Sequence, residues 1–262
     1  MRIATWNVNS IRQREKHVAE WLGRVQPDLL LLQETKCEPQ HFPAETFAGL
    51  GYQTEVVGQK SYNGVAVLSK APVEVMHRCL PGLDCDDNQA RYIEVRADGL
   101  TVGNLYLPNG NSGGPAGYDY KLRWMECLAA RAEALLEADE PCLFAGDYNV
   151  CPTDEDFAPG TLPAEDALVR AESRAAFRKM LWLGLTDAIR AVQPRGKAYT
   201  FWDYQAGAWR RDAGLRIDHA LLSPDVAERL ISAKPDRDER NQPQPSDHVP
   251  VLVELAAYTN SR

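Results

Sequence analysis

The chain has 262 residues, of which 44% are hydrophobic and 25% are charged, a composition typical of soluble globular proteins and sufficient for a large buried core. Its 29 basic and 37 acidic side chains give a net charge of −8, so the overall charge does not favour a nucleic-acid-binding protein. We expect one domain over residues 1–262. A local basic surface stays open, and its candidate side chains are Arg12, Arg14, Lys16, Arg195, Lys197, Arg210, Arg211 and Arg216.

Cysteine spacing and the first residues indicate the compartment. The six cysteines show no C-x-x-C spacing, which argues against a zinc site and against a compact disulfide framework. We therefore expect free thiols in a reducing cytosol at Cys37, Cys79, Cys85, Cys127, Cys142 and Cys151. The first residues enter a strand pattern without a signal sequence, and no apolar run is long enough to cross a bilayer. We expect a cytoplasmic protein that does not attach to membranes.

Short apolar runs rich in Val, Ile and Leu predict buried strands along the whole chain. In chain order these runs are residues 3–6, 28–32, 64–68, 101–107, 141–145, 217–222 and 249–255. Helices are predicted around Val18 to Val25, from Trp124 to Leu135, and over residues 172–183, where apolar residues recur at helical spacing. The stretches 52–75 and 92–106 hold adjacent strands without helices, which indicates antiparallel pairing. The pattern predicts a sheet sandwich flanked by helices.

Polar side chains follow many of these apolar runs at the point where each run ends. An Asp or Asn at that point is often turn chemistry, and Asp218 could simply pair with Arg216. The recurrence favours another interpretation, because the ends of neighbouring strands share one edge of a packed sheet and could form one site. The polar residues at these ends are Asn7, Asn9, Gln33, Glu34, Thr35, Tyr106, Asn109, Asp147, Asn149, Asp218, His219, Asp247 and His248.

Several carboxylates at one site predict a bound cation. Two carboxylates a few ångströms apart repel each other by roughly 4 kcal/mol at an effective dielectric near 20, so a cluster needs a cation or protons. Oxygen ligands favour Mg²⁺ or Mn²⁺ over zinc. A hard divalent ion, a histidine oriented by a carboxylate, and neutral amide and phenol donors suit the attack of water on a phosphodiester.

Six separated motifs in order resemble the exonuclease III and AP endonuclease family of the endonuclease/exonuclease/phosphatase superfamily. The motifs lie at residues 3–9 (IATWNVN), 32–36 (LQETK), 62–66 (YNGVA), 146–149 (GDYN), 214–219 (GLRIDH) and 245–248 (PSDH). The resemblance runs to about residue 255. It implies an α/β fold, a four-layered α/β sandwich in which two mixed, mostly antiparallel sheets pack face to face with helices on the outside.

The resemblance also implies an activity and roles for the strand-end residues. The activity is that of a Mg²⁺-dependent DNA repair nuclease in base excision repair, which cuts 5′ to abasic sites and acts at 3′ ends as an exonuclease and phosphatase. Asp147 and Asn149 would position or deprotonate water, and His248, paired with Asp247, would contact the phosphate. The implied catalytic set is Tyr106, Asp147, Asn149, Asp218, Asp247 and His248, and the implied metal set is Asn7, Glu34, Asp147, Asn149, Asp247 and His248, with help from Asn9. Asp218 would orient His248 or a metal.

The partner implied by the resemblance is double-stranded DNA with abasic sites or 3′ ends, bound by a monomer. Residues implied to contact DNA are Arg12, Lys36, Tyr62, Asn63, Arg91, Asn109, Phe201, Trp202, Gln205, Leu215 and Ile217. Among them, Phe201, Leu215 and Ile217 would wall a pocket for a base-less sugar, although some relatives have Trp where this chain has Leu215. Phe201 and Trp202 could instead be core aromatics, and each cation could be ordinary solvated surface.

Two other functions fit the same fold. Some relatives lose the acidic residues and act as RNA-associated regulators, whereas Glu34, Asp147 and His248 are all present here. Other superfamily members hydrolyse phospholipids or phosphoinositides with the same metal and histidine chemistry. The GLRID and QETK stretches favour nucleic acid, and cleavage of an abasic duplex with and without EDTA would separate these possibilities.

Overall fold

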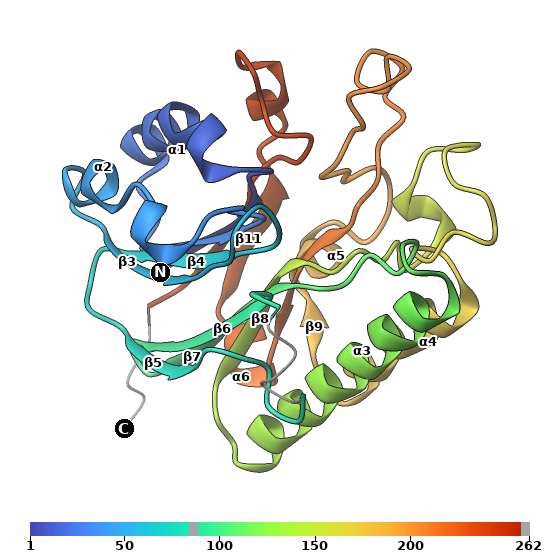
Figure 1. Cartoon of the computed structure of the whole chain (residues 1–262). Coiled ribbons are helices and arrows are strands. Elements are labelled where there is room, and N and C mark those ends of the chain that lie inside the picture. The colour runs from blue at the N-terminus through green and yellow to red at the C-terminus, as the bar shows by residue number, and fades with distance from the viewer. Residues whose placement is uncertain (84–88, 258–262) are drawn as a thin grey trace.

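Two six-stranded sheets form the centre of the computed structural model, which describes residues 1–83 and 89–257 (Figure 1). The first sheet has the strand order β11-β12-β1-β2-β4-β3 and the second has the order β5-β6-β7-β8-β10-β9. The strands of the first sheet are β1 (Arg2–Asn7), β2 (Leu29–Gln33), β3 (Gln53–Val57), β4 (Val65–Ser69), β11 (Leu230–Pro235) and β12 (Val251–Leu255). Those of the second are β5 (Glu74–His77), β6 (Tyr92–Ala97), β7 (Leu100–Tyr106), β8 (Cys142–Asp147), β9 (Thr186–Asp187) and β10 (Asp218–Leu222).

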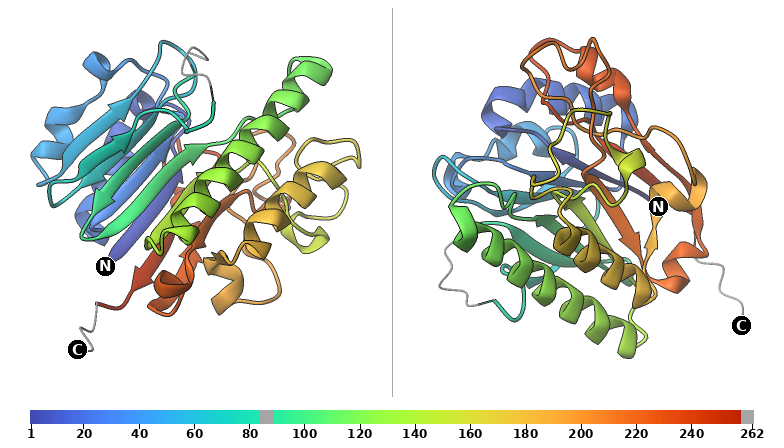
Figure 2. Two further views of the ribbon diagram at one scale, coloured as in Figure 1. Left: turned by 90° about the horizontal axis from the view of Figure 1, so that it is seen from below. Right: turned by 90° about the vertical axis from the view of Figure 1, so that its right-hand side faces the viewer.

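Helices cover the outer face of each sheet, which gives four layers (Figure 2). Helices α1 (Ile11–Val25) and α2 (Ala44–Ala48) pack on the first sheet, and α3 (Gly114–Glu137) and α4 (Ala171–Trp182) pack on the second. The predicted sandwich of two mixed, mostly antiparallel sheets is confirmed. The shorter elements are α5 (Ala188–Val192), α6 (Pro224–Ala227) and 3₁₀ turns at Pro39–His41, Asp154–Asp156 and Arg237–Asn241.

The central strands are mostly apolar because each buries both faces. In β1, Ile3 packs between the sheets, whereas Ala4 and Trp6 face the helices on the outside. In β2, the odd-numbered leucines from Leu29 pack between the sheets and the even-numbered ones pack under α1. A strand covered on both faces loses the usual alternation of polar and apolar residues. This explains why each predicted apolar run overlaps a strand.

Strand register brings the polar strand ends together. Strands β1 and β2 run parallel, with Asn7 beside Gln33, and β7 and β8 run parallel, with Tyr106 beside Asp147. Strand β10 is antiparallel to β8, so its first residue, Asp218, lies beside Asp147. The carboxyl ends of both parallel pairs and the amino end of β10 therefore meet at one end of the sandwich, where long loops project at the top of Figure 1.

A buried ion network holds the segment that leads into β10. The Arg216 side chain is 1% exposed, and its Nε lies 2.6 Å from Asp156 Oδ1 while Nη1 lies 2.7 Å from Asp187 Oδ2. Arg190 pairs with the same Asp156 oxygen at 2.6 Å. Arg216 therefore pairs with Asp156 and Asp187 and not with Asp218, so the alternative interpretation of Asp218 as the partner of Arg216 is wrong.

The cysteines and the helices bear on the expected compartment. Thiols are free at Cys37, Cys127, Cys142 and Cys151, as expected. The expectation is wrong for Cys79, which is disulfide-bonded, and Cys85 lies outside the described residues. Within the described ranges, no helix combines the length and the apolar character that a membrane crossing requires.

Replacing Asp156 with Asn should lower the free energy of unfolding at pH 7 by about 3–5 kcal/mol, because Arg216 and Arg190 lose a buried partner. Asp154 supplies the matched control, since its side chain is 86% exposed and pairs with Arg174 at the surface. The D154N change should cost less than about 1 kcal/mol. Urea denaturation of both variants measures the difference.

The pH dependence of the D156N effect has a definite sign. Burial acts to raise the pKa of Asp156, but hydrogen bonds and charge from Arg216 and Arg190 hold it well below the usual value. Its stabilising contribution is therefore complete above the unfolded-state pKa of about 3.9 and is lost as the pH falls further. The difference in the free energy of unfolding between wild type and D156N should become smaller below about pH 4. A gap that stays constant down to the acid transition would contradict this assignment.

Candidate active site

One amide group joins carboxylates from the two sheets. Asn7, the last residue of β1, donates from Nδ2 to Glu34 Oε1 at 2.9 Å and to Asp147 Oδ2 at 3.0 Å. Glu34 directly follows β2 in the first sheet, and Asp147 ends β8 in the second. Lys36 Nζ lies 2.8 Å from the other Glu34 oxygen. The predicted gathering of Asn7, Glu34 and Asp147 at one place is therefore present.

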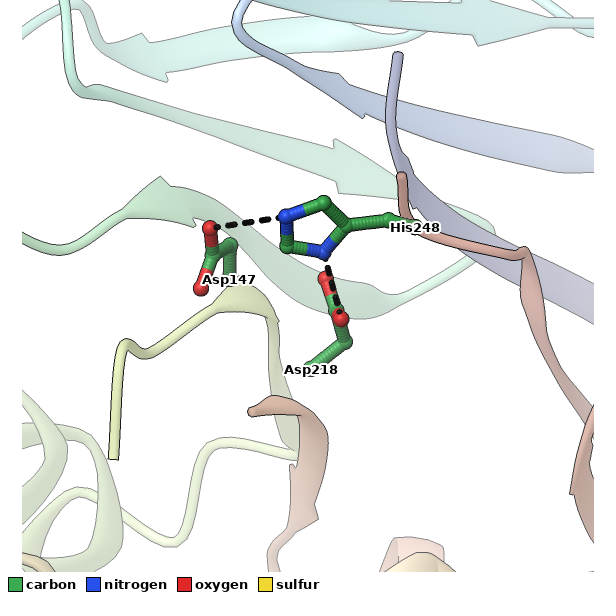
Figure 3. Close-up of side chains that lie close together, drawn as sticks. All are labelled: Asp147, Asp218 and His248. Atoms are coloured by element: carbon green, nitrogen blue, oxygen red, sulfur yellow. Dashed lines mark hydrogen bonds and ion pairs between the residues drawn. The ribbon is translucent and has the colours of Figure 1, made fainter. Parts of the chain in front are cut away.

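An imidazole lies between two buried carboxylates (Figure 3). His248 Nδ1 lies 2.8 Å from Asp218 Oδ2, and His248 Nε2 lies 3.8 Å from Asp147 Oδ2. Asp218 is 0% exposed, and the same Oδ2 atom accepts a hydrogen bond from Thr200 Oγ1 at 2.6 Å. Because a carboxylate faces Nδ1, that nitrogen carries a proton, and Nε2 is left for the site.

The expected pairing of His248 with Asp247 is wrong. The Asp247 carboxylate accepts hydrogen bonds from Asn9 Nδ2 at 3.1 Å and from Ser246 Oγ at 3.3 Å, and it is half-buried on the rim. Ser246 Oγ also donates to the Asn7 carbonyl at 2.7 Å and accepts from the His248 backbone N–H at 3.2 Å. Ser246 therefore fixes the turn that presents the imidazole, while Asp218 orients it.

Two asparagines continue the site along the second sheet. The Asn149 N–H donates to Asp147 Oδ1 at 2.9 Å, and its side-chain amide donates to the Leu107 carbonyl at 2.9 Å. Asn109 Nδ2 donates to Asn149 Oδ1 at 3.0 Å. Tyr106 is half-buried beside them at the end of β7. The two amides and the phenol form a wall of neutral donors and acceptors next to Asp147.

The charges in the site shift several pKa values. Burial, with the nearby charge of Asp218, raises the pKa of Asp147 to about 7 against the opposing charge of His248. Burial alone would lower the pKa of His248, but the charge of Asp218 and the hydrogen bond to it raise the pKa to about 10. Burial and the charges of Glu34 and Asp147 hold the pKa of Tyr106 well above its usual value. The phenol is therefore a protonated donor at neutral pH.

Backbone strain collects around the same residues. Left-handed φ angles are uncommon for side chains other than glycine, and such conformations cluster at functional sites. Here they occur on four of the loops that carry predicted site residues, those after β1, β2 and β8 and the one before β4. The residues are Asn9 (44°), Ser10 (89°), Glu34 (51°), Lys36 (53°), Asn63 (50°) and Asn149 (48°).

The residues expected to contact DNA lie mainly around this site. The Arg91 guanidinium lies 4.8 Å from the centre of the Tyr106 ring, and the Phe201 ring meets the His248 ring edge-on at 4.9 Å. Asn63 and Lys36 are half-buried on the loops beside β4 and β2. The exposed members of the set are Arg12, Tyr62, Asn109 and Gln205.

A cavity of about 560 Å³ adjoins the imidazole on the side of Phe201. Its wall includes Phe201, Leu215, Gln205 and Arg211, so the expected pocket residues Phe201 and Leu215 do share a cavity. Ile217 is 3% exposed and packs in a small cluster behind Leu215.

The expected DNA contact is wrong for Trp202, whose side chain is wholly buried and donates to Asp212 Oδ1. The alternative interpretation, a core aromatic, is correct for this residue. Trp202 packs with Tyr199 and Val249 beneath the loops of the site.

Three residues that support the site were missed. Thr200 bonds Asp218, Lys121 donates to the Asn149 carbonyl at 2.6 Å, and Arg14 donates to the Asn9 carbonyl at 2.7 Å. Arg14 and Lys121 are buried cations on helices, and Lys121 falls on the apolar stripe of its helix, which is a signal readable in the sequence. Thr200 carries no such signal.

The donor set suits a hard divalent cation. The carboxylates of Glu34 and Asp147 converge, Asp147, Asp218 and His248 offer ligand atoms within 4.8 Å of one another, and Asp218 Oδ1 is buried without a partner among the described residues. Buried negative charge of this density is stabilised by a cation. Asn7 turns its nitrogen toward both carboxylates, so its oxygen would serve as a ligand only after a half-turn of the amide.

Such a centre suits the attack of water on a phosphate ester, so the fold and the site together define a phosphoesterase. The model of the Endonuclease/Exonuclease/phosphatase family matches residues 4–248, and the chain belongs to this family.

Individual relatives agree with the resemblance to exonuclease III and the AP endonucleases. The chain is 32% identical to exodeoxyribonuclease III of Haemophilus influenzae, over 97% of this chain and 100% of the relative. Two structures of NExo from Neisseria superpose with a TM-score of 0.93 at 37% and 36% identity, over 98% of this chain and 100% of theirs. One is described as a 3′-5′ exonuclease and the other as a 3′ phosphatase bound to a product DNA hairpin. An AP endonuclease from Archaeoglobus fulgidus superposes at 0.92 with 35% identity, over 98% and 100%.

Replacing Asp218 with Asn should lower kcat for phosphodiester cleavage by about 100-fold or more, because the imidazole loses the carboxylate that orients it and stabilises its positive charge. D247N is the matched comparison, since Asp247 neighbours His248 in the sequence but does not contact its ring; we expect its loss of kcat to be at least about tenfold smaller. Steady-state kinetics on folded variants decide the assignment. A larger loss in D247N than in D218N would restore Asp247 as the partner of His248.

Proposed function

We propose that the protein is a Mg²⁺-dependent DNA repair nuclease that hydrolyses phosphodiester bonds 5′ to abasic sites and trims or unblocks the 3′ ends of duplex DNA. The observation that carries the proposal is the position of His248 between Asp147 and Asp218, next to the Glu34 carboxylate. The relatives named as exodeoxyribonuclease III, AP endonuclease, exonuclease and 3′ phosphatase support it. The role is that of base excision repair.

The site residues divide the work of hydrolysis. Asp147, whose pKa is raised by burial, holds or accepts the proton of the attacking water, and Asn149 orients that water beside it. His248 carries a positive charge toward the phosphate, and the protonated Tyr106 donates to it. Bound Mg²⁺ or Mn²⁺ would neutralise the developing charge on the phosphate.

We assign the metal to the oxygens near Glu34. One nitrogen of Asn7 contacts both Glu34 and Asp147, which brings a carboxylate from each sheet to the same point. The wider set of proposed ligands also includes Asn149, Asp247 and His248, of which His248 would bind a metal only as the neutral imidazole. Mg²⁺ retains several water ligands in such sites, and phosphate oxygens of the substrate could replace some of these waters.

We infer that duplex DNA lies across the loop end of the sandwich. Phosphate contacts would come from cations and amides on the rim, and they would hold DNA despite the acidic total charge. The residues proposed for this surface are Arg12, Lys36, Tyr62, Asn63, Arg91, Asn109 and Gln205. Phe201, Leu215 and Ile217 would form or support the wall of the pocket next to His248.

We further propose one domain over residues 1–262 acting as a monomer in the cytoplasm. One pair of packed sheets supplies the site. Among residues 1–83 and 89–257, four cysteines are free thiols, which supports a reducing compartment, whereas the disulfide at Cys79 argues against it.

Cleavage of an abasic duplex, a 3′-phosphate duplex and a recessed 3′ end, each with Mg²⁺ and with EDTA, tests the proposal. We expect metal-dependent cleavage, and E34Q should raise the Mg²⁺ concentration for half-maximal rate by about tenfold or more, because the site loses a charged ligand. Glu38, a half-exposed acid on the same loop, gives the matched control E38Q, which should leave this concentration unchanged. Hydrolysis of phosphoinositides without cleavage of any duplex would replace the proposal with the lipid alternative.

Arg91→Ala should weaken DNA binding and make the plot of log affinity against log salt less steep by about one unit, because one phosphate contact is lost. Arg96 lies near the other end of β6, the strand that Arg91 directly precedes, and pairs with Glu140, so R96A is the control and should leave the slope unchanged. Fluorescence anisotropy with a labelled duplex at several salt concentrations measures both slopes. Equal slopes in wild type and R91A would remove Arg91 from the DNA surface.

A further inference from the structure

A buried lysine reaches the site from the helical layer. Lys121 lies on α3 in the same stripe as Trp124, Met125 and Leu128, which pack against the second sheet. Its side chain is 0% exposed. Within residues 1–83 and 89–257 no carboxylate forms an ion pair with its ammonium group. A lysine buried in this way is costly unless its charge is stabilised by other groups.

Three backbone carbonyls take the place of a counter-ion. Lys121 Nζ donates to the Asn149 carbonyl at 2.6 Å, to the Asn109 carbonyl at 2.9 Å and to the Ala167 carbonyl at 3.2 Å. All three hydrogens of the ammonium group are thereby used, which is the full donor capacity of lysine. The Asn109 carbonyl belongs to the loop that follows β7, and the other two belong to the start and the end of the connection between β8 and α4.

Both loops carry the amide wall of the site. The side chains of Asn109 and Asn149 bond each other, and the Asn149 backbone N–H bonds Asp147 Oδ1. Lys121 holds the carbonyl of each asparagine, so its position sets the spacing between the two loops. The fit is tight, because a Cβ atom on Gly110, whose φ is +88°, would lie 2.7 Å from Lys121 Cδ.

The third carbonyl links this arrangement to α4. The Ala167 carbonyl also accepts a hydrogen bond from Ser173 Oγ at 2.7 Å, and the Ala167 N–H donates to Asn111 Oδ1 at 2.9 Å. The segment before α4 is therefore bonded to the loop after β7 through Asn111 and to α4 through Ser173. An apolar side chain at position 121 could pack α3 against the sheet equally well. The ammonium group of Lys121 therefore serves to bond the loops.

We propose that Lys121 is a positioning residue for the cleavage reaction, which fixes the Asn109 and Asn149 amides against Asp147 from behind the site. This inference rests on the proposed nuclease function. Lys121 does not contact the reacting atoms and acts through Asn149. Small displacements of such groups are costly, since an error of about 1 Å can lower a rate by about 100-fold.

Lys121→Met tests the proposal, because methionine keeps the apolar stem and removes all three donors. We expect kcat on an abasic or recessed-end duplex to fall by about 10- to 100-fold with KM changed by less than about threefold, the pattern of a lost transition-state interaction. Arg131→Met is the matched control. Arg131 is a partly buried cation on the same helix. Its Nη2 atom lies 2.7 Å from Oε1 of the buried Glu94, and this pair is not part of the site. R131M should lower the melting temperature without lowering kcat.

A double-mutant cycle separates positioning from general support of the fold. In an Asn149→Ala background, K121M should cost less than about threefold further, because the amide through which Lys121 acts is already gone. If K121M does not fold, K121Q, which keeps two donors on a shorter stem, takes its place, with a smaller but still non-additive loss expected. Loss of kcat in K121M equal to that in R131M, or a fully additive loss in the double variant, would overturn the inference. Absence of cleavage by the wild-type protein would instead overturn the proposed function.

Discussion

A single amide nitrogen connects the two halves of the site. Asn7 Nδ2 donates to Glu34 from the first sheet and to Asp147 from the second. Two carboxylates that share one hydrogen-bond donor lie close enough to repel each other by several kcal/mol at an effective dielectric near 20. This is roughly half the net free energy of unfolding of a domain. The core between the sheets holds them there, and the polar bridge from Gln33 Nε2 to Asn104 Oδ1, at 2.8 Å, crosses the same gap just beneath the site.

The fold and most of the site were readable in the sequence for one reason. Strands buried on both faces appear as unbroken apolar runs, and the first polar residue after each run marks its end. Strand register then places Tyr106, Asp147 and Asp218 side by side. The runs did not reveal β9 and β11, since β9 spans only two residues and β11 is a partly exposed edge strand. Neither strand supplies a residue to the site.

The errors have physical causes of their own. Asp247 and His248 are neighbours in the turn that Ser246 holds, and this turn directs the histidine toward Asp218 and the aspartate toward Asn9 on the rim. The DNA role of Trp202 fails because an aromatic residue beside a pocket residue in sequence points away from the pocket into the core. Thr200 was invisible because its hydroxyl acts through a contact between residues 18 apart. Lys121 could be noticed in the sequence as a charged residue on the apolar stripe of a helix. Its role could not be predicted, because its three carbonyl partners are brought together only in the folded structure.

Because the site is divided between two sheets, phosphodiester cleavage depends on the packing of one sheet against the other. Asn7 and Glu34 come early in the chain, Asp147 and Asp218 come from its second half, and His248 follows all of them. A chain that has assembled only one sheet holds no imidazole between carboxylates and no oxygen cage for a cation. Hydrolysis therefore requires that both sheets are formed and packed against each other, because neither sheet alone assembles the carboxylates and the imidazole.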